Sequence, residues 1–425
     1  MDRNQVIGFL LIGAIIVGFG ILNQPSAEEI KAAQQARDSI ALVEKKAEQK
    51  KVVQEKKTEA AIAVADSTLG DSVVALRDAA LFGSFSASAK GSDAVTTLEN
   101  ELIKVQISNK GGRVKSVELK KYKTFYGQPV KLFDGDSTRF SLNFFAENKS
   151  ISTADLYFTP IGKSVIVKEK DSASLTMRLQ AGANQYIDYI YTIKGNSYLL
   201  DYKINFNGIN NIVAANNSYM EIDWQQNLIN QEREAKSERQ YSSIYYQYND
   251  GSEEVESITP TSDEKEELKT NVKWVAMKQH FFTQVLIADK AFESPTNIET
   301  EGSASEDDRI IKRTKASFTI PYDHKPNETF AMHFYFGPNH YQTLKKTGYS
   351  LQKQIPLGWG IFGWVNKALV IPIFNWLNSF ALNYGLIILI LTIVIKVILL
   401  PLTYKAYLSQ AKMKVLKPEM EEIQA

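Results

Sequence analysis

Two long apolar segments, one near each end of the chain, constrain the fold more than any other feature of the sequence. Residues 6–22 carry no charge, and residues 384–404 carry a single one, Lys396. Stretches of about 20 apolar residues are long enough to cross a bilayer as helices. The chain of 425 residues is therefore predicted to be a mixed membrane protein, in which transmembrane helices bracket a water-soluble middle part.

The first apolar segment is either a cleaved signal sequence or a retained anchor. A cleavable signal needs small residues in an A-x-A-like pattern after the apolar core, whereas Asn23, Gln24 and Pro25 follow here. We therefore expect residues 1–24 to form an uncleaved transmembrane signal anchor. Residues 25–96 begin with a stretch rich in Ala, Glu and Lys that cannot build a core, so we interpret them as a solvated spacer, either partly helical or disordered.

Residues 97–350 show short runs in which apolar and polar side chains alternate. Ile103 and Val105 belong to one such run, which ends at turn residues 109–112 before the alternation resumes, and this pattern predicts a β-hairpin. The same pattern recurs on both sides of a Gly-Asn turn at residues 195–196. Short strands with frequent turns predict a large antiparallel β-sandwich rather than a βαβ fold.

The C-terminal part is predicted to return to the membrane. Residues 351–382 contain three tryptophans and are expected to form an amphipathic helix in the membrane interface, with Pro372 interrupting any continuous helix. Residues 383–404 are expected to form a transmembrane helix, and residues 405–425 to begin a cytoplasmic helical hairpin. Four lysines follow the span closely, which by the positive-inside rule places its far end, and the N-terminus of the chain, in the cytoplasm: Lys405, Lys412, Lys414 and Lys417.

Lys396 lies inside the second predicted span, where a charge at the bilayer centre costs about 2.5 to 3.5 kcal/mol on insertion scales. One interpretation is snorkelling, in which the long stem carries the ammonium to the inner interface. The other follows from helical spacing, which puts Thr392, Lys396 and Thr403 on one stripe together with other small and polar residues. Such a stripe is typical of a wet cavity on that side of the helix.

Other classes of function find little support in the sequence. The net charge of +1 gives no basic field of the kind that binds DNA, and zero cysteines exclude disulfides and thiolate metal sites. The four histidines show no metal-binding spacing, so neither a metal nor another cofactor is expected. An alternative function is a membrane-tethered periplasmic carbohydrate-binding or carbohydrate-modifying protein, in which Glu232, Glu234 and His280 perform acid/base chemistry.

Several motifs together resemble the YidC family of bacterial membrane protein insertases, in its Gram-negative form. The basic residue Lys396 precedes Pro-Leu-Thr at 401–403 by five positions, and the run from Ser409 to Met413 leads to Leu416 and Pro418. Upstream, the resemblance extends over an N-terminal anchor that starts at Met1, a hairpin at 98–122, Lys-Trp-Val-Ala-Met-Lys at 273–278, Phe-Gly-Pro at 336–338 and the Trp-rich interfacial segment.

This resemblance implies a periplasmic β-supersandwich similar to mutarotase-like domains and a core of five helices around a hydrophilic groove. Lys396 matches a groove residue that is usually arginine, with Thr392 and Thr403 beside it as further substrate-groove residues. The implied function is to insert and help fold nascent membrane proteins in the inner membrane, without enzymatic chemistry. Implied partners are the Sec translocon with its accessory subunits, ribosomes and membrane lipids.

The end of the chain departs from the family pattern. Ala425 falls inside what the resemblance implies is the first helix of the cytoplasmic hairpin, and four further core spans of the family are not in the sequence. We therefore expect the sequence to be a fragment of a longer protein. The alternative is a short form that cannot insert proteins alone.

Overall fold

The structure, a computed structural model, describes residues 71–135, 138–302, 309–380 and 382–424. The predicted anchor at 1–24 and the predicted spacer up to residue 70 lie outside the described residues. The chain divides into two compact units, residues 1–81 and residues 82–425. The first described element is α3 (Asp71–Phe82).

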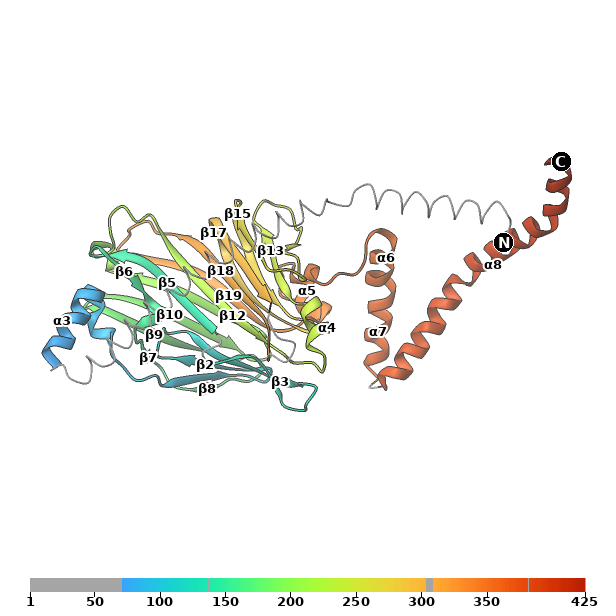
Figure 1. Cartoon of the computed structure of the whole chain (residues 1–425). Helices are drawn as coiled ribbons and strands as arrows, with labels where there is room; N and C mark the ends of the chain where they lie inside the picture. The colour runs from blue at the N-terminus through green and yellow to red at the C-terminus, as the bar shows by residue number, and fades with distance from the viewer. Residues whose placement is uncertain (1–70, 136–137, 303–308, 381, 425) are drawn as a thin grey trace. The chain divides into compact units, whose positions relative to one another are not determined.

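Most of the second unit is β structure (Figure 1). Its larger sheet has fourteen strands, ten of which follow one path. In spatial order these are β6 (Lys149–Ser152), β5 (Thr138–Ala146), β12 (Tyr219–Ile229), β18 (Ile310–Pro321), β17 (Phe282–Gly302), β19 (Asn327–Pro338), β11 (Leu199–Asn207), β10 (Gln185–Lys194), β9 (Ser172–Gly182) and β7 (Thr159–Ile161). The remaining four lie off this path: β15 (Glu264–Leu268) and β16 (Val272–Lys278) pair with β17, β13 (Ser243–Tyr248) pairs with β16, and β14 (Glu256–Ser257) pairs with β13.

A second sheet has five strands. In spatial order they are β4 (Pro129–Asp134), β3 (Val114–Lys123), β2 (Ile103–Ser108), β1 (Val95–Glu99) and β8 (Val165–Ile166). All paired strands of both sheets are antiparallel except β1 and β8. The predicted large antiparallel β-sandwich is therefore confirmed.

The core forms because the large sheet curls and its two halves face each other. Trp224 on β12 meets Phe334 on β19, with ring centroids 6.0 Å apart, and the Gln226 amide donates to Gln284 across the same gap. The five-stranded sheet packs against this core through Phe133, whose ring lies 5.8 Å from that of Phe336. Alternating strand residues point into this space, as the period of two requires.

Both predicted hairpins are present. Ile103 pairs with Leu119 and Val105 with Val117, and the turn between them contains two glycines with positive φ, Gly111 and Gly112. Placing a Cβ on Gly112 would bring it within 2.8 Å of the Phe158 ring, so glycine is needed there for space as well as for backbone conformation.

The β domain begins earlier than residue 97. The short helix η1 (Gly83–Ser88) buries Phe85 completely in the main core, and its ring lies 5.6 Å from that of Phe144. The Ser88 hydroxyl donates to the backbone carbonyl of Gln180 at 3.1 Å. Residues 83–96, placed in the spacer by their composition, therefore pack as part of the domain. A single buried aromatic residue in a polar stretch is too weak a signal to show this in the sequence.

Shorter helical elements lie between the strands and after the last one. They are η3 (Thr153–Asp155), η4 (Ile209–Asn211), α4 (Ala235–Gln240), α5 (Tyr341–Lys345) and η5 (Leu351–Gln354). After β19, the chain stays attached to the β domain as far as η5. The Trp274 indole donates to the carbonyl of Tyr349 at 3.0 Å, and the Thr283 hydroxyl donates to the Gln354 side chain at 3.1 Å.

The Trp-rich segment is helical from residue 360 to residue 378, although Pro372 was expected to interrupt it. It comprises α6 (Gly360–Val365), the π-helical turn η6 (Asn366–Val370) and α7 (Ile371–Asn378), with Pro372 in the first turn of α7. Proline cannot donate a backbone hydrogen bond and its ring clashes with the preceding turn of an α-helix. The wider π turn placed just before it accommodates the ring, so the helix continues.

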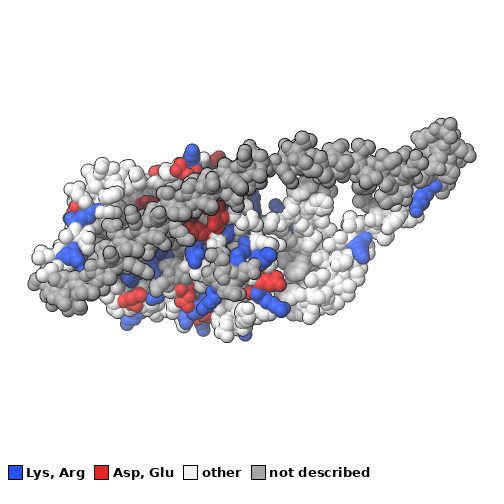
Figure 2. Space-filling view, viewed as in Figure 1, with Lys and Arg blue, Asp and Glu red and all other residues white. Residues whose placement is uncertain are grey.

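The last element is α8 (Tyr384–Gln424), a helix of 41 residues. Within the part of the chain that the structure describes, two helical stretches are long and apolar enough to cross a membrane, Gly360–Asn378 with a mean hydropathy of 1.2 and Tyr384–Pro401 with a mean hydropathy of 2.6. Figure 2 shows few charges on α6–α8 compared with the β domain. The interfacial position expected for residues 351–382 stays a prediction, since length and composition also permit a span.

Candidate functional site

The three residues predicted to line a groove lie on one face of α8. With 3.6 residues per turn, positions 392, 396 and 403 fall within an arc of about 40°. Lys396, Thr392 and Thr403 are all exposed. The neighbouring side chains of this helix are apolar and exposed too, among them Val397 and Leu400. The helix therefore carries a polar stripe with one positive charge on an otherwise apolar surface.

The two threonine hydroxyls bond to their own helix. Thr392 donates to the carbonyl of Ile388 at 2.8 Å, and Thr403 donates to the carbonyls of Leu399 and Leu400 at 3.1 and 3.0 Å. Such bonds satisfy a hydroxyl proton where water is scarce and leave the oxygen lone pairs outward. The stripe can thus accept hydrogen bonds at two positions and offer a positive charge between them.

The element α7 packs against the start of α8. The Phe374 ring stacks on that of Tyr384, and Leu377 and Ile387 are buried in the same region. These contacts lie at the start of α8, more than one turn before Thr392. The described residues therefore supply one face for the predicted groove, and the groove itself stays a prediction.

The three residues considered for acid/base chemistry in the β domain lie in different settings. His280 lies two residues before β17, and its ring is stacked between those of Tyr241 and Phe281, with ring centroids 4.3 and 4.0 Å away. Burial lowers the pKa of this imidazole and raises the pKa of the Glu232 carboxyl. Glu234 is exposed at the start of α4.

The carboxylate that the fold buries in this region is Glu238, which no sequence pattern singled out. It accepts the backbone N–H groups of Gln231 and Glu232 at 2.9 and 3.3 Å, and the Gln279 side chain donates to its other oxygen at 3.4 Å. Burial raises the pKa of this carboxyl to about 7. Because its oxygens hold a backbone turn in place, we assign Glu238 a structural role.

A second titratable cluster surrounds His333 on β19. Its Nδ1 lies 2.8 Å from Asp201 and its Nε2 lies 2.6 Å from Asp289. The hydrogen bond to Asp201 raises the pKa of His333. No group of three or more potential metal ligands occurs within the described ranges. In this cluster His333 connects the two carboxylates through hydrogen bonds.

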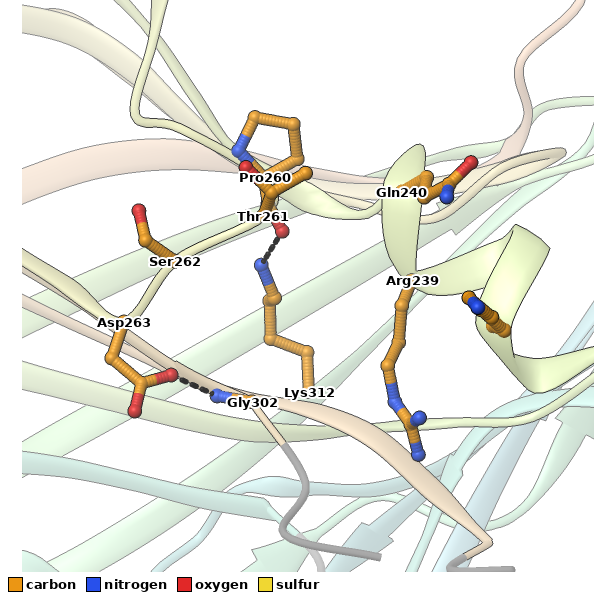
Figure 3. A pocket seen from close by; sticks show the side chains of 9 residues that line it. Arg239, Gln240, Pro260, Thr261, Ser262, Asp263, Gly302 and Lys312 are labelled. Carbon is orange, nitrogen blue, oxygen red and sulfur yellow. Dashed lines mark hydrogen bonds between the residues drawn. The ribbon is translucent and has the colours of Figure 1, made fainter. Parts of the chain in front are cut away.

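Figure 3 shows a pocket beside α4, lined by Arg239, Asp263 and Lys312 among others. Its volume is about 430 Å³. Its polar groups are largely occupied by the protein itself: the Lys312 ammonium donates to the carbonyl of Pro260 at 2.6 Å, and Asp263 accepts the Gly302 N–H at 2.6 Å. Arg239 donates to the carbonyl of Ile311. A carbohydrate-modifying site needs a free acid and base facing one cavity, so this pocket does not favour the carbohydrate alternative.

Two family models match different parts of the chain. The family model for the YidC periplasmic domain matches residues 95–372, and the model for the 60Kd inner membrane protein matches residues 376–425. A membrane protein insertase YidC of Parabacteroides distasonis is 37% identical over the whole chain, and one of Bacteroides fragilis is 36% identical. The chain covers 67% and 66% of these two relatives, so it spans about two thirds of their length.

Two solved structures are similar at a greater distance. A crystal structure of an active YidC insertase covers 78% of this chain and 61% of its own, with 15% identity and a TM-score of 0.30. A putative aldose 1-epimerase from Escherichia coli covers 57% of this chain and 98% of its own, with 9% identity and a TM-score of 0.33. The family assignment follows from the sequence matches, which extend over both the β domain and α8: the chain belongs to the YidC family of membrane protein insertases.

Proposed function

We propose that this chain works in a membrane protein insertase and chaperone that inserts and helps fold nascent integral membrane proteins, alone or with the Sec translocon. It would lie in the bacterial inner membrane with the N-terminus in the cytoplasm and the β domain in the periplasm. Support comes from the family membership and from the relatives, which are named membrane protein insertases. The observation that carries the proposal is the stripe of Thr392, Lys396 and Thr403 on an apolar helix surface.

The proposed task of the stripe is to lower the cost of bringing polar parts of a substrate into the membrane. An acidic residue at the bilayer centre costs about 2.5 to 3.5 kcal/mol on insertion scales. A lysine ammonium about 6 Å away, at an effective dielectric constant of about 20, returns about 3 kcal/mol of attraction. The attraction to one positive charge is therefore large enough to offset the cost of bringing one acidic residue into the membrane.

Lysine is sufficient for this task. Arginine presents a planar fork that can hold a carboxylate in one geometry, whereas lysine acts as a point charge on a flexible stem. A passing segment needs attraction without tight binding, since it must leave again. We therefore expect Lys396 to act through charge, with no covalent step and no cofactor.

Further partners are proposed at the cytoplasmic end. Lys405, Lys412 and Lys414 are exposed on α8 after the apolar part ends. They suit contact with ribosomal RNA or with anionic lipid head groups, and topology alone also accounts for them. Accessory subunits of the Sec translocon complete the set of proposed protein partners.

The test is insertion of substrates that differ only in their translocated acidic residues. The native protein that contains this chain is purified and reconstituted, and the inserted fraction is measured by protease protection. Lys396→Ala is expected to reduce insertion of the acidic substrates more than that of neutral ones, because only the former need the charge. Lys396→Arg is the matched control and is expected to insert both.

Equal insertion of acidic and neutral substrates by Lys396→Ala would overturn the role of the charge. Thr392→Val and Thr392→Ser separate the hydroxyl from the size of the side chain at the neighbouring position. Loss of insertion in the valine variant alone would indicate that the stripe also works through hydrogen bonds.

A further inference from the structure

The β domain has a distinct end from which the chain leaves toward α6. The Thr283 hydroxyl on β17 contacts Gln354, the last residue of η5. Phe281 lies two residues before Thr283, about 7 Å along the strand. The Phe281 carbonyl also accepts the Asn339 N–H at 2.7 Å. The last attached residue of the domain and the start of β17 therefore lie at the same end.

Four exposed aromatic side chains gather at this exit end. Phe125 and Tyr126 form the tip of the β3–β4 loop, with exposed fractions of 57% and 71%. Tyr241 and Phe281 stack on the two sides of His280 and are about half exposed. We call Phe125, Tyr126, Tyr241 and Phe281 the exit-end patch.

Hydrogen bonds and a ring contact connect the loop tip to the rest of this patch. The Phe125 N–H donates to the carbonyl of Gln231 at 3.0 Å, and Gln231 is held by Glu238 on α4, three residues before Tyr241. The Tyr122 ring, at the base of the same loop, lies 5.4 Å from that of Phe282. The four aromatic residues thus come from three loops that meet at one end of the domain.

A basic groove of about 590 Å³ adjoins the patch. Tyr126, Lys131, Arg233 and Arg309 line it, and its one lining carboxylate, Asp134, pairs with Lys131 at 2.7 Å. The Arg233 guanidinium lies over the Phe125 ring at 5.8 Å. Arg233 and Arg309 are exposed, and neither makes a salt bridge within the described ranges. Figure 2 shows further Lys and Arg side chains, interspersed with Asp and Glu, on the β domain toward this end.

The short link between η5 and α6 keeps the exit-end patch close to α6. Four residues lie between Gln354 and Trp359, and the five steps from one Cα to the next, at about 3.6 Å each, span at most about 18 Å. Trp359 and Trp364 are exposed on and next to α6, and tryptophans of this kind lie at the membrane interface. A surface tied so closely to a bilayer meets it at a high effective concentration, so weak attraction suffices.

From this geometry we propose that the exit-end patch docks the β domain on the outer surface of the bilayer. Phe125, Tyr126, Tyr241 and Phe281 enter the interfacial layer, where aromatic side chains are favoured. Arg233 and Arg309 bind lipid phosphates, since guanidinium groups match phosphate oxygens in pairs. The proposal rests on the proposed function only in that α6–α8 lie in the membrane.

The test uses a fluorescent probe attached to a single introduced cysteine. The label is specific for that position because the chain has no cysteine of its own. Tyr126→Cys in the full chain is labelled with an environment-sensitive dye and reconstituted into vesicles of phosphatidylethanolamine and phosphatidylglycerol. The emission is expected to shift to the blue, and spin-labelled lipid is expected to quench it.

Tyr219→Cys is the matched control, because Tyr219 is also an exposed tyrosine and lies at the other end of β12. Ile229, at the near end of that strand, accepts a hydrogen bond from Gln279 beside the patch, so Tyr219 lies about 34 Å away. Its probe should keep a water-like emission. Gln128→Cys, on the same loop as Tyr126, provides a second labelling site if the tyrosine variant misfolds.

Water-like emission at both loop sites would overturn the proposal. A blue-shifted emission that spin-labelled lipid does not quench would overturn it too, because another protein would then cover the patch. A second arm tests the phosphate contacts with the double variant Arg233→Glu and Arg309→Glu. Loss of the blue shift supports them, whereas an unchanged shift overturns the role of the arginines. Because the readout is lipid contact, it is independent of insertion by Lys396 variants.

Discussion

The β domain and the helices α6–α8 arrange apolar side chains in opposite ways. In the β domain the largest aromatic residues are inside, and Trp274 and Tyr202 are completely buried. On the helices the large apolar residues are outside, with Trp359 82% exposed and Leu400 64% exposed. A surface of this kind is stable only in an apolar medium. In both regions apolar groups avoid water. In the β domain they do so by burial in the core, and on the helices they do so by facing an apolar medium.

The largest expected effect tests this comparison with two tryptophans. Trp274→Ala should lower the free energy of unfolding of the β domain by about 3 to 5 kcal/mol, because it empties a space in the core and removes the hydrogen bond to Tyr349. Trp364→Ala, on the exposed face of α6, should change it by less than about 0.5 kcal/mol. Urea unfolding of both variants in lipid nanodiscs, followed by near-UV circular dichroism, measures the difference.

An equal loss of stability in both variants would break the comparison. It would mean that Trp364 packs against protein, as a core residue does, and that lipid is not its solvent. The unchanged chain in the same nanodiscs provides the reference for both measurements.

The next prediction compares the replacement of a lysine on α8 with the replacement of an exposed lysine on the β domain. Lys396→Leu should favour membrane insertion of residues 384–404 by about 2.5 to 3.5 kcal/mol if the ammonium lies at the bilayer centre. Lys203→Leu replaces an exposed lysine on β11 and should change the stability of the β domain by less than about 0.5 kcal/mol. Glycosylation mapping of the inserted fraction gives the first value and urea unfolding gives the second.

This measurement also separates the two interpretations of Lys396. An effect below about 1 kcal/mol would put the ammonium at the interface by snorkelling and remove the need for a groove. A full effect would require a partner for the charge, either water or another segment of protein.

Local patterns in the sequence predicted the elements well. Alternation predicted the strands, and Gly111 and Gly112 marked the turn of the first hairpin because a positive φ favours glycine. Apolar length predicted α8 because a spanning helix needs no partner to be recognised. These features depend on neighbours in the sequence, so a single chain is enough to find them.

Features that depend on distant residues were missed. Glu238 is buried because α4 folds onto Gln279, 41 residues later, and nothing in the sequence around Glu238 indicates that contact. The pocket beside α4 and the exit-end patch likewise combine loops that are far apart in the chain. For the stripe on α8, spacing predicted the shared face of Lys396 and the two threonines, while the walls of a groove would have to come from other segments.

Glu238 provides the smallest of these effects and a counterpart to Lys396, since each is an ionisable group in a poorly hydrated place. Burial raises the pKa of Glu238 to about 7 from an ordinary value of 4.5. Between these two values the folded state binds more protons than the unfolded state, so the free energy of unfolding falls as the pH rises. The expected loss from this group between pH 4 and pH 8 is about 2 to 3 kcal/mol.

The variant Glu238→Gln should remove this part of the pH dependence, because the amide oxygen still accepts the N–H of Gln231 but carries no titrating proton. Glu234→Gln, on an exposed side chain beside the same helix, should change the stability by less than about 0.5 kcal/mol at either pH. Urea unfolding at several pH values measures all three proteins. An unchanged slope in Glu238→Gln would show that hydrogen bonds from the backbone hold this carboxylate ionised, and that donors alone can offset burial in the β domain as water is proposed to do for Lys396 in the membrane.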